Sequence, residues 1–523
     1  MTADIALSRI RRVVATLGLA ATCVPAALAA PPEPPPGHAR MIVAFKPGTA
    51  SAVRAAVGAI GGQVREEIFD TRAMAVEVPE RALPALERNP NVEYVEADVK
   101  RYLLSTASPS TGTPYLTGQL VPWGIKAVQA DLLASNSVAS RKVCIIDSGY
   151  DGAHEDLPSN GVNGEYDTGT GWWYTDENGH GTHVAGTIAA LNNAGGVVGV
   201  VSNGSITLHI VKVFSASGWA YSSSLTSAAN KCKAAGAHVI SMSLGGSLSS
   251  KTEQTAFDKL LAGGILPIAA AGNGGNSRVS YPAGYASVMS VAAVDINNAR
   301  ASFSQYNKDV EIAGPGVGVL STVPTGTGVA SSLTVDTTKF AAGDMEGSPV
   351  KIAIGLLADF GLGDKTSPAV SGKVCLIQRG TVDFATKVSN CQASGGLGAV
   401  IYNNVAGGFS GTLGTTVTSI PSLTVSDTDG AALKGRIGEQ ATVAVTPGNY
   451  AVFDGTSMAT PHVSAVAAMV WATHPGCTVA QLRNSLNYSA KDLGTAGRDA
   501  NFGWGLVQAK AAIDRIASKG CGL

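Results

Sequence analysis

The sequence has little net charge and no run of basic residues. Its 37 Lys and Arg residues almost balance its 38 Asp and Glu residues, so the formal net charge at pH 7 is -1. A protein that binds nucleic acid presents a positively charged face to the phosphate groups. The charge pattern therefore excludes nucleic acid as an expected partner.

The sequence also lacks the common zinc-binding patterns. It has seven cysteines, but no two of them stand in the Cys-x-x-Cys spacing that structural zinc sites use. His180 and His183 occur together without the glutamate of the His-Glu-x-x-His motif. These absences argue against a zinc cluster. A metalloenzyme built on the two histidines remains an alternative.

No apolar run after residue 30 is long enough to cross a membrane. A spanning helix needs about 20 apolar residues, and the run Val463–Trp471 is better explained as part of a core helix. We therefore expect no membrane association of the mature protein.

The first thirty residues have the layout of a secretory signal. Basic residues precede an apolar run that ends in a small-x-small pattern; they are Arg9, Arg11 and Arg12, and the pattern is Ala27-Leu28-Ala29. The short length disfavours a membrane anchor, and Thr22 disfavours lipidation of Cys23. We expect residues 1–30 to be a signal peptide and the protein to be secreted and extracellular.

Export favours disulfide bonds, because extracellular compartments are oxidising. Removal of Cys23 leaves six of the seven cysteines, and six allow 15 pairings. Proximity in the sequence favours Cys375–Cys391 and Cys477–Cys521, which leaves Cys144–Cys232 as the remaining pair.

The chain is long and apolar enough for several folded domains. Hydrophobic residues make up 45% of its 523 residues, which excludes general disorder. Residues 38–104 follow the order strand, helix, strand, strand, helix, strand, which is typical of a small ferredoxin-like α+β domain. The stretch Ser105–Gly118 is rich in Ser, Thr, Gly and Pro and indicates an exposed linker that is open to cleavage.

Buried strands alternate with helical stretches in residues 105–324, and residues 447–523 return to long helical patterns. The continuous apolar strands are Val143–Ile146, Ile206–Val213, His238–Met242 and Ile265–Ala271. This pattern predicts an α/β fold, a doubly wound and mostly parallel sheet with helices on both faces. Residues 325–446 are rich in Gly, Thr and Val and indicate a mainly β inserted domain.

Three segments place reactive side chains at glycine-rich ends of elements. Asp147 ends a buried strand, His180 and His183 open a helix, and Ser457 enters an Ala-rich helix. Each has a simpler interpretation by itself: a capping aspartate, metal-binding or core histidines, and an ordinary N-cap serine. Those interpretations do not explain why all three occur in one secreted α/β domain.

The three segments resemble the Asp, His and Ser boxes of the subtilisin-like serine proteases (subtilases, peptidase family S8), in that family's order. The matching stretches are His180-Gly-Thr-His-Val-Ala-Gly186 and Gly455-Thr-Ser-Met-Ala-Thr-Pro-His462. The resemblance covers most of residues 119–324 and 447–523. It implies a secreted serine endopeptidase that acts on proteins or peptides through an acyl-enzyme.

The resemblance assigns roles residue by residue. Ser457 matches the nucleophile, His180 the general base, and Asp147 the group that orients the imidazole. Asn273 matches the amide that stabilises the oxyanion, together with the backbone N–H of Ser457. His183 and His462 are expected to be structural.

The resemblance also implies a groove in which a substrate binds as an added strand. Its matching residues are Gly218 on one edge and Ser243, Leu244 and Gly245 on the other. No acidic residue occupies a matching position in the primary pocket. We therefore expect a broad or apolar primary specificity.

The stretch Ala190–Val200 resembles the calcium loop of secreted subtilisins. The matching ligands of a structural Ca²⁺ are Gln119, Asp156, Leu191, Asn193, Gly195 and Val197, with carbonyls from Leu191, Gly195 and Val197. An ordinary Asn/Gly turn is the alternative.

Residues 38–104 resemble the inhibitor-like propeptide of subtilases, which acts as an intramolecular inhibitor and folding chaperone. We expect a self-processing zymogen that is cut between Leu103 and Gly118. Residues 325–446 look like a protease-associated (PA) domain, with the matching stretches Gly372–Gly380 and Ala399–Asn404. The alternative function is a catalytically silent subtilase fold that binds proteins through the PA domain.

Overall fold

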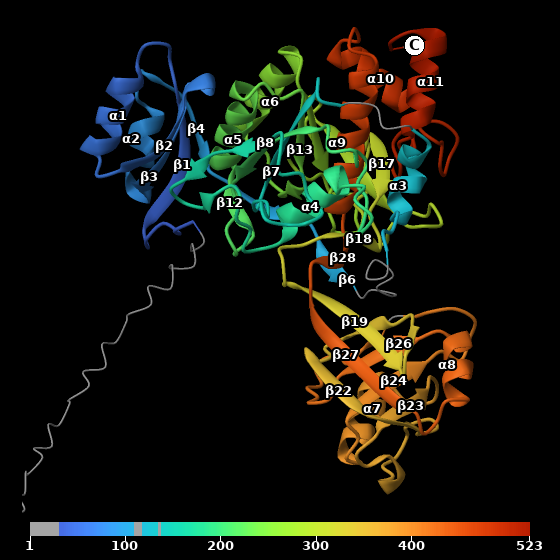
Figure 1. Ribbon diagram of the computed structural model, residues 1–523. Helices are drawn as coiled ribbons and strands as arrows, with labels where there is room; N and C mark the ends of the chain where they lie inside the picture. Colours follow the sequence, from blue (N-terminus) through green and yellow to red (C-terminus); the bar gives the residue numbers. More distant parts are fainter. Residues whose placement is uncertain (1–30, 109–117, 134–137, 410, 523) are drawn as a thin grey trace, which may run out of the picture.

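The computed structural model describes residues 31–108, 118–133, 138–409 and 411–522. Figure 1 shows three folded units: an N-terminal one beside α5 and α6, a central one, and an inserted one reached through β19 and β27. The predicted signal peptide, residues 1–30, lies outside the described residues. Within the described residues, no helix is both long and apolar enough to cross a membrane.

The N-terminal unit has the predicted ferredoxin-like arrangement. Its antiparallel sheet has the order β2-β3-β1-β4. The elements are β1 (His38–Phe45), α1 (Ala50–Ala59), β2 (Gln63–Ile68), β3 (Ala73–Pro79), α2 (Leu83–Glu87) and β4 (Val92–Ala97). Its core forms because Val53 and Val57 of α1 pack on Val43 and Met74 of the sheet.

The central unit contains the predicted parallel sheet, with the strand order β17-β16-β15-β13-β7-β11-β8. Every pair in it is parallel. Its strands are β7 (Lys142–Asp147), β8 (Val162–Gly164), β11 (Thr207–Lys212), β13 (Val239–Met242), β15 (Leu266–Ala270), β16 (Met289–Val294) and β17 (Ile312–Pro315). The α/β prediction is therefore confirmed.

Helices cover both faces of this sheet because its strands are apolar on both sides. Val143 and Ile145 face the cluster that holds α4 and α9, whereas Cys144 and Ile146 face the cluster that holds α5 and α6. The helices are α3 (Trp123–Ala127), α4 (His180–Ala189), α5 (Ser222–Ala234), α6 (Lys251–Ala262), α9 (Thr456–Thr473), α10 (Val479–Ser489) and α11 (Ala509–Lys519).

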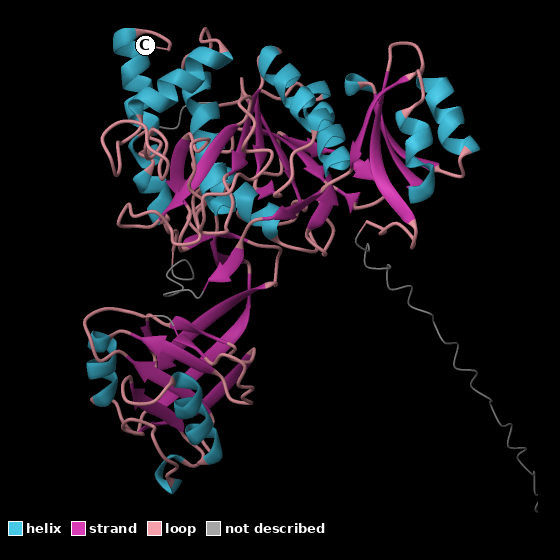
Figure 2. Cartoon of the chain, turned by 180° about the vertical axis from the view of Figure 1, so that it is seen from behind, coloured by secondary structure: helices cyan, strands magenta, loops and turns pink. Residues whose placement is uncertain are grey.

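The inserted unit is built around a nine-stranded sheet with its own apolar clusters. Figure 2 shows from behind how it is set apart from the central unit. Its elements are β19 (Gly328–Val335), β20 (Thr338–Phe340), β21 (Gly343–Glu346), β22 (Lys351–Asp359), β23 (Val374–Gln378), α7 (Phe384–Ala393), β24 (Gly398–Tyr402), β25 (Gly411–Thr412), β26 (Ser422–Val425), α8 (Asp427–Lys434) and β27 (Gln440–Gly448). The prediction of a mainly β insertion is confirmed.

Short strands connect the N-terminal unit to the central one. The connecting chain forms β5 (Lys100–Leu103) and β6 (Thr106–Ser108). Strand β5 lies between β12 (Trp219–Tyr221) and β14 (Leu244–Gly245), while β6 pairs with β28 (Tyr450–Asp454), which also pairs with β18 (Val319–Thr322). A separate small ribbon is formed by β9 (Tyr166–Asp167) and β10 (Gly171–Trp172).

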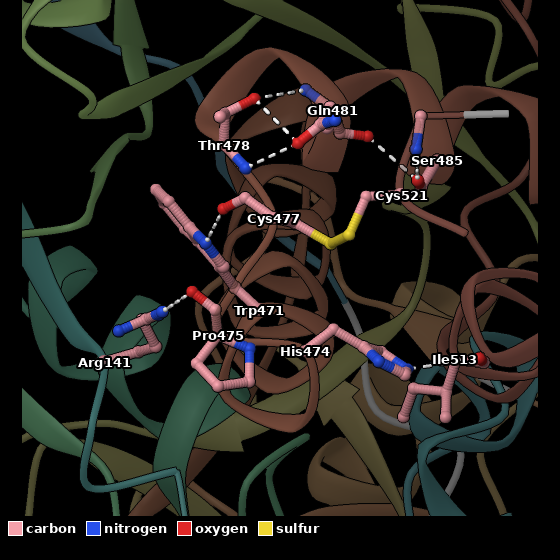
Figure 3. The surroundings of a disulfide bond; sticks show 11 residues. Arg141, Trp471, His474, Pro475, Cys477, Thr478, Gln481, Ser485, Ile513 and Cys521 are labelled. Carbon is pink, nitrogen blue, oxygen red and sulfur yellow. Dashed lines mark hydrogen bonds between the residues drawn. A yellow bond between two sulfur atoms is a disulfide. The ribbon is translucent and has the colours of Figure 1, made fainter.

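Three disulfides form in the structure, Cys144–Cys232, Cys375–Cys391 and Cys477–Cys521. Two of them are the pairs that proximity in the sequence favoured, and Cys144–Cys232 is the pair that was left over. Figure 3 shows Cys477–Cys521, which ties the segment between α9 and α10 to the residues after α11. Beside it, Trp471 Nε1 donates to the carbonyl of Cys477 at 2.8 Å, which fixes the end of α9.

Candidate active site

The carboxyl end of the parallel sheet brings Asp147 and His180 together. Asp147 is the last residue of β7, and His180 is the first residue of α4. His180 Nδ1 lies 2.7 Å from Asp147 Oδ1, and both side chains are buried. His180 Nε2 is buried and has no hydrogen-bond partner among the described residues. The imidazole is therefore held by one nitrogen, with the other available to a reacting group.

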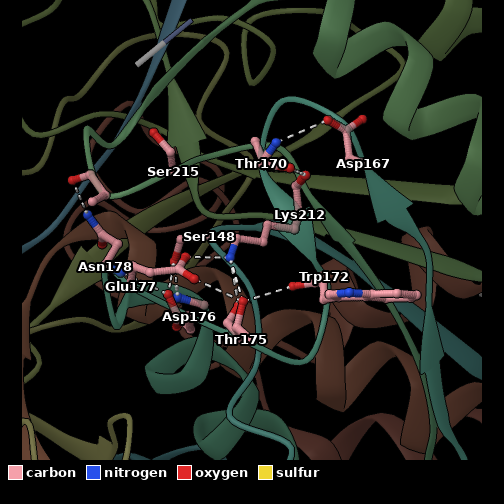
Figure 4. A network of polar contacts seen from close by, with 12 residues as sticks. Ser148, Asp167, Thr170, Trp172, Thr175, Asp176, Glu177, Asn178, Lys212 and Ser215 are labelled. Carbon is pink, nitrogen blue, oxygen red and sulfur yellow. Dashed lines mark hydrogen bonds and ion pairs between the residues drawn. The ribbon is translucent and has the colours of Figure 1, made fainter. Parts of the chain in front are cut away.

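Asp176 holds the start of α4, a role that the sequence analysis missed. Figure 4 shows Asp176 beside Ser148. Its carboxylate accepts hydrogen bonds from Gly179 N, Thr182 N and Ser148 Oγ, each at 2.8 Å. Gly179 has a φ of 90°, a conformation that favours glycine, and provides no capping side chain. Asp176 thus replaces the missing N-cap and fixes His180. An acidic residue just before a predicted helix was the available signal.

Ser457 lies in the first turn of α9 and is buried. Its Oγ donates a hydrogen bond to the carbonyl of Ser243 at 2.8 Å and accepts one from Leu104 N at 3.2 Å. The described contacts of Ser457 Oγ include no hydrogen bond to His180. In this state of the chain the hydroxyl is directed at the substrate groove and not at the imidazole.

The carbonyl oxygen of Leu104 lies between two hydrogen-bond donors. Asn273 Nδ2 is 2.7 Å from it, and Ser457 N is 3.3 Å from it. Asn273 is oriented by Thr456, whose N and Oγ1 donate to Asn273 Oδ1 at 2.9 and 2.7 Å. This is the geometry that stabilises negative charge on a carbonyl oxygen.

Strand β5 occupies the predicted groove as an added strand. Leu103 N donates to the carbonyl of Gly218 at 3.1 Å. On the other side, Leu244 is paired with Leu103 and Gly245 with Tyr102, both antiparallel. A Cβ on Gly245 would stand 3.0 Å from Leu104 Cδ1, so the glycine leaves space for that side chain. The groove residues predicted from the sequence therefore border this strand, with Ser243 bonded to Ser457.

A pocket of about 360 Å³ continues the groove beyond Leu104. Ala107 of β6 lines it, together with Val452 and Phe453 of β28 from the central unit. The inserted unit supplies Val329 and Met345 among the other lining residues. No sequence pattern indicated this pocket, because its walls come from two separately folded units.

Two further histidines are buried as structural groups. His183 Nε2 lies 3.0 Å from the carbonyl of Val319, and His462 Nδ1 lies 2.8 Å from that of Met458. Burial lowers the pKa of His183 to about 3 and that of His462 to about 4. Both rings are therefore neutral donors at neutral pH.

The predicted calcium ligands gather around the side chain of Gln119. Its amide nitrogen lies 2.6 Å from the carbonyl oxygen of Leu191, 2.9 Å from that of Gly195 and 3.4 Å from that of Val197. Asn193 Oδ1 is 3.3 Å away. Four oxygens thus converge on one point, which is the donor type that Ca²⁺ takes.

Asp156 supplies the only carboxylate of this predicted ligand set. Its Oδ2 accepts from Val197 N at 2.9 Å, while its buried Oδ1 has no hydrogen-bond partner in the part of the chain that the structure describes. Burial raises the pKa of Asp156 to about 7. An unpaired buried carboxylate oxygen beside converging carbonyls fits a cation. No group of three His, Cys, Asp or Glu residues able to hold a metal occurs in the described chain.

The sequence comparisons agree with this geometry. The model of the subtilase family matches residues 139–345 and 431–505. The chain belongs to the subtilase family. In this subtilase, residues 334–433 match the PA domain and residues 39–98 match the fervidolysin N-terminal prodomain.

Curated relatives and solved structures give the same family. This subtilase is 41% identical over 264 residues to alkaline elastase YaB of Bacillus sp. (strain YaB), covering 49% of this chain and 64% of that protein. It is 38% identical over 299 residues to subtilisin NAT of Bacillus subtilis subsp. natto, covering 55% of this chain and 74% of that protein. The chain thus spans slightly less than two thirds of alkaline elastase YaB.

Two solved structures share the fold. The psychrophilic subtilisin-like protease Apa1 from the Antarctic psychrotroph Pseudoalteromonas sp. AS-11 has a TM-score of 0.64 and 40% identity, covering 77% of this chain and 100% of Apa1. Fervidolysin from Fervidobacterium pennivorans has a TM-score of 0.58 and 22% identity, covering 91% of this chain and 61% of fervidolysin. The second likeness shows the fold alone.

Proposed function

We propose that this subtilase is a secreted serine endopeptidase that is made as a zymogen and cuts itself between Leu104 and Ser105. The observation that carries the proposal is the carbonyl of Leu104, which lies 2.7 Å from Asn273 Nδ2 and 3.3 Å from Ser457 N. The connecting chain on both sides of this carbonyl is bound as a strand, β5 before it and β6 after it. That arrangement is what a peptide substrate needs.

The chemistry follows from the positions of the side chains. Rotation about the Cα–Cβ bond of Ser457 moves its hydroxyl from the Ser243 carbonyl toward the unpartnered Nε2 of His180. His180 takes the proton while Oγ attacks the carbonyl carbon of Leu104. Asp147, bonded to Nδ1, stabilises the resulting imidazolium.

Asn273 and the Ser457 N–H stabilise the oxyanion of the tetrahedral intermediate. The C–N bond to Ser105 then breaks, and His180 returns the proton to the leaving amine. Water, activated by the same imidazole, hydrolyses the acyl-enzyme and releases the carboxylate of Leu104. Every side chain used in these steps belongs to the described part of the chain.

Several contacts support a role of residues 38–104 as inhibitor and folding template. Asp98 accepts from Ser223 N at 2.9 Å at the start of α5. Glu96 accepts from Lys251 N at 2.8 Å and from Thr252 N at 2.9 Å at the start of α6. Two carboxylates of the N-terminal unit thus cap two helices of the central unit, where they also favour the helix dipoles.

The surroundings of Leu104 support an apolar or broad specificity. Its side chain lies beside Gly245, and the glycine leaves the space that the leucine uses. We place the domain boundaries at residues 38–104 for the propeptide, 105–324 and 447–523 for the catalytic domain, and 325–446 for the PA domain. Residues 1–30 are proposed as the signal for export.

The proposal includes a structural Ca²⁺ held by Gln119, Asp156 and the loop that contains Asn193. Bound there, the ion would neutralise the buried carboxylate and crosslink three segments of the catalytic domain. The ion takes no part in the reaction. Its ligands support the fold on the side where the chain resumes after the cut.

The test is to produce the full chain and its Ser457→Ala variant side by side. We expect the wild-type chain to yield a fragment that begins at Ser105, and the variant to stay uncut, since loss of this nucleophile costs roughly 10⁶-fold in turnover. A serine-directed fluorophosphonate should label Ser457 of the processed chain. An unlabelled and uncut wild-type chain would support the silent binding module in place of an enzyme.

A further inference from the structure

One side chain of the bound strand is buried more deeply than Leu104, the residue before the proposed cut. Arg101 is the fourth residue before the proposed cut, and its side chain is fully buried. Tyr102, between Arg101 and the cut, is 47% exposed. The groove therefore recognises the residue at position 101 by its side chain, whereas it holds position 102 mainly by its backbone.

The guanidinium of Arg101 is bound by a carboxylate of the catalytic domain. Arg101 Nε lies 3.0 Å from Glu253 Oε1, and Arg101 Nη2 lies 2.5 Å from Glu253 Oε2. The contact is therefore bidentate, with a geometry that arginine fits and lysine does not. The third nitrogen, Nη1, donates to the carbonyl of Lys100 at 3.1 Å.

The carboxylate is also held by the catalytic domain itself. Glu253 lies on α6 with its side chain fully buried in the uncut chain. The hydroxyl of Tyr285 donates to Glu253 Oε2 at 2.8 Å and accepts from Ser250 N at 2.8 Å. A Cβ on Gly246 would stand 2.9 Å from Arg101 Nη1, so the glycine leaves room for the guanidinium.

The energetic consequence concerns the processed enzyme. Glu253 belongs to the catalytic domain and stays there when the propeptide leaves. A ligand that covers this carboxylate without pairing it leaves a buried charge uncompensated, which is strongly unfavourable. The backbone pairing with β12 and β14 sets the same register for any peptide, so the fourth side chain before the cut always meets Glu253.

We propose that Glu253 and Tyr285 form a specificity subsite that selects arginine at the fourth position before the scissile bond of peptide and protein substrates. This inference rests on the proposed function and adds to it a second specificity determinant beside the apolar primary pocket. The preferred substrate class is then a peptide with arginine followed, three residues later, by an apolar residue at the cut.

The test compares three peptides that share leucine before the cut and differ only at the fourth position, with arginine, its neutral isostere citrulline, or leucine there. With the processed wild-type enzyme, we expect kcat/KM to be about 100-fold higher for the arginine peptide than for the other two. In Glu253→Gln the preference for arginine over citrulline should fall to within about threefold. Asp258→Asn, which removes an exposed charge from the same helix, should keep it.

A double variant without either charge provides a second test, which applies even if Glu253→Gln fails to fold. Replacing Arg101 and Glu253 together by leucine removes both buried charges, an exchange that is often neutral or stabilising. We expect the full chain with both changes to process itself, and the enzyme it yields to prefer the leucine peptide over the arginine peptide.

The outcomes separate the two proposals. Wild-type enzyme that cleaves all three peptides at rates within threefold overturns the subsite and leaves the proposed function intact. Wild-type protein that cleaves none of them, and that no fluorophosphonate labels, overturns the proposed function and the subsite with it. Retention of the arginine preference in Glu253→Gln also overturns the subsite.

Discussion

At the scale of single residues, the site depends on a glycine that has no side chain. Gly455 is the residue before α9, and a Cβ there would collide with the carbonyl oxygen of Leu104 and stand 3.2 Å from Asn273 Nδ2. The space that receives the oxyanion is thus kept open by a missing side chain. With a side chain at position 455, the carbonyl of Leu104 could not reach its two hydrogen-bond donors.

This argument gives a prediction for Gly455→Ala. We expect turnover on a leucine peptide to fall by at least about 100-fold, the scale of losing one oxyanion donor. The melting temperature of the protein should change little by comparison. Gly476→Ala is the control, because a Cβ at Gly476 meets no atom within 4 Å. Full turnover in Gly455→Ala would contradict the assigned oxyanion site.

At the scale of elements, helices α4 and α9 carry both the proposed reacting groups and two neutral histidines that are buried in their packing. His183 lies one turn after His180 on α4 and stacks on Phe453 with ring centroids 4.3 Å apart. His462 follows Ser457 on α9 and is fully buried. Protonation of either ring would place a charge in the core beside the reacting residues.

The pKa values of these histidines predict an acid-sensitive fold. Both pKa values in the folded state, about 3 and about 4, lie below the ordinary histidine value of 6.5. The unfolded chain therefore binds more protons as pH falls, so stability is full above about pH 6.5 and decreases below it. From pH 7 to pH 5, each histidine should lower the free energy of unfolding by about 2 kcal/mol.

The measurement is urea unfolding of the Ser457→Ala protein at pH 7 and pH 5, in the presence and absence of His183→Gln. Glutamine can still donate to the carbonyl of Val319 but does not titrate. The extra substitution should remove about half of the contribution from the two histidines. An unchanged pH dependence in this variant would show that His183 is not buried in the neutral form.

At the scale of the whole molecule, segments far apart in the sequence meet at the proposed calcium ligands and at the boundary between domains. Gln119 follows the proposed cut, and Asp156 and Asn193 lie on two loops of the catalytic domain. The pocket beside Ala107 joins the catalytic and PA domains. Both features form only when these distant segments pack against one another.

The calcium ligands predict a chelator-sensitive enzyme. Binding at 100 times the dissociation constant adds about 2.7 kcal/mol to stability, so removal of Ca²⁺ by EGTA should lower the inactivation temperature by roughly 5–10 °C. Asp156→Asn should lose most of this difference, whereas Asp514→Asn, an exposed change on α11, should keep it. Equal inactivation temperatures of the wild type with and without EGTA would refute the ion.

Because the PA domain lines the pocket beside Ala107, we expect KM to depend on how far a peptide extends after the cut. Val329 is 38% exposed and lines the same pocket as Ala107, the third residue after the proposed cut. Val329→Asp should raise KM about tenfold for peptides with an apolar residue there, but not for peptides that end before it. Ile352→Asp, at a residue 55% exposed and outside that pocket, is the matched control. Equal KM changes for long and short peptides would show that the PA domain does not contact the substrate.

Much of the candidate site could be predicted from the sequence, because its residues lie in short local motifs. A strand that ends in Asp147, glycines before His180 and a helix that begins at Ser457 can each be recognised within ten residues. The alternation of buried strands and helices likewise predicted the parallel sheet. Cys375 and Cys391 could be paired by proximity because they stand only 16 residues apart.

The remaining features arise from contacts between distant segments. Arg101 and Glu253 are 152 positions apart, and no local pattern marks either as a partner of the other. The sequence restricted the cut to a stretch of residues, but only the register of β5 between β12 and β14 placed the carbonyl of Leu104 against Asn273.

The sequence by itself determined the family and the order of the domains, and it predicted the reacting residues, because each depends on local spacing and on the burial pattern of single elements. Only the tertiary structure decided which peptide bond lies at Ser457, which carboxylate meets the arginine and which residues of the PA domain reach the groove. Those features require separately folded surfaces to be brought into register, and that register is set by packing.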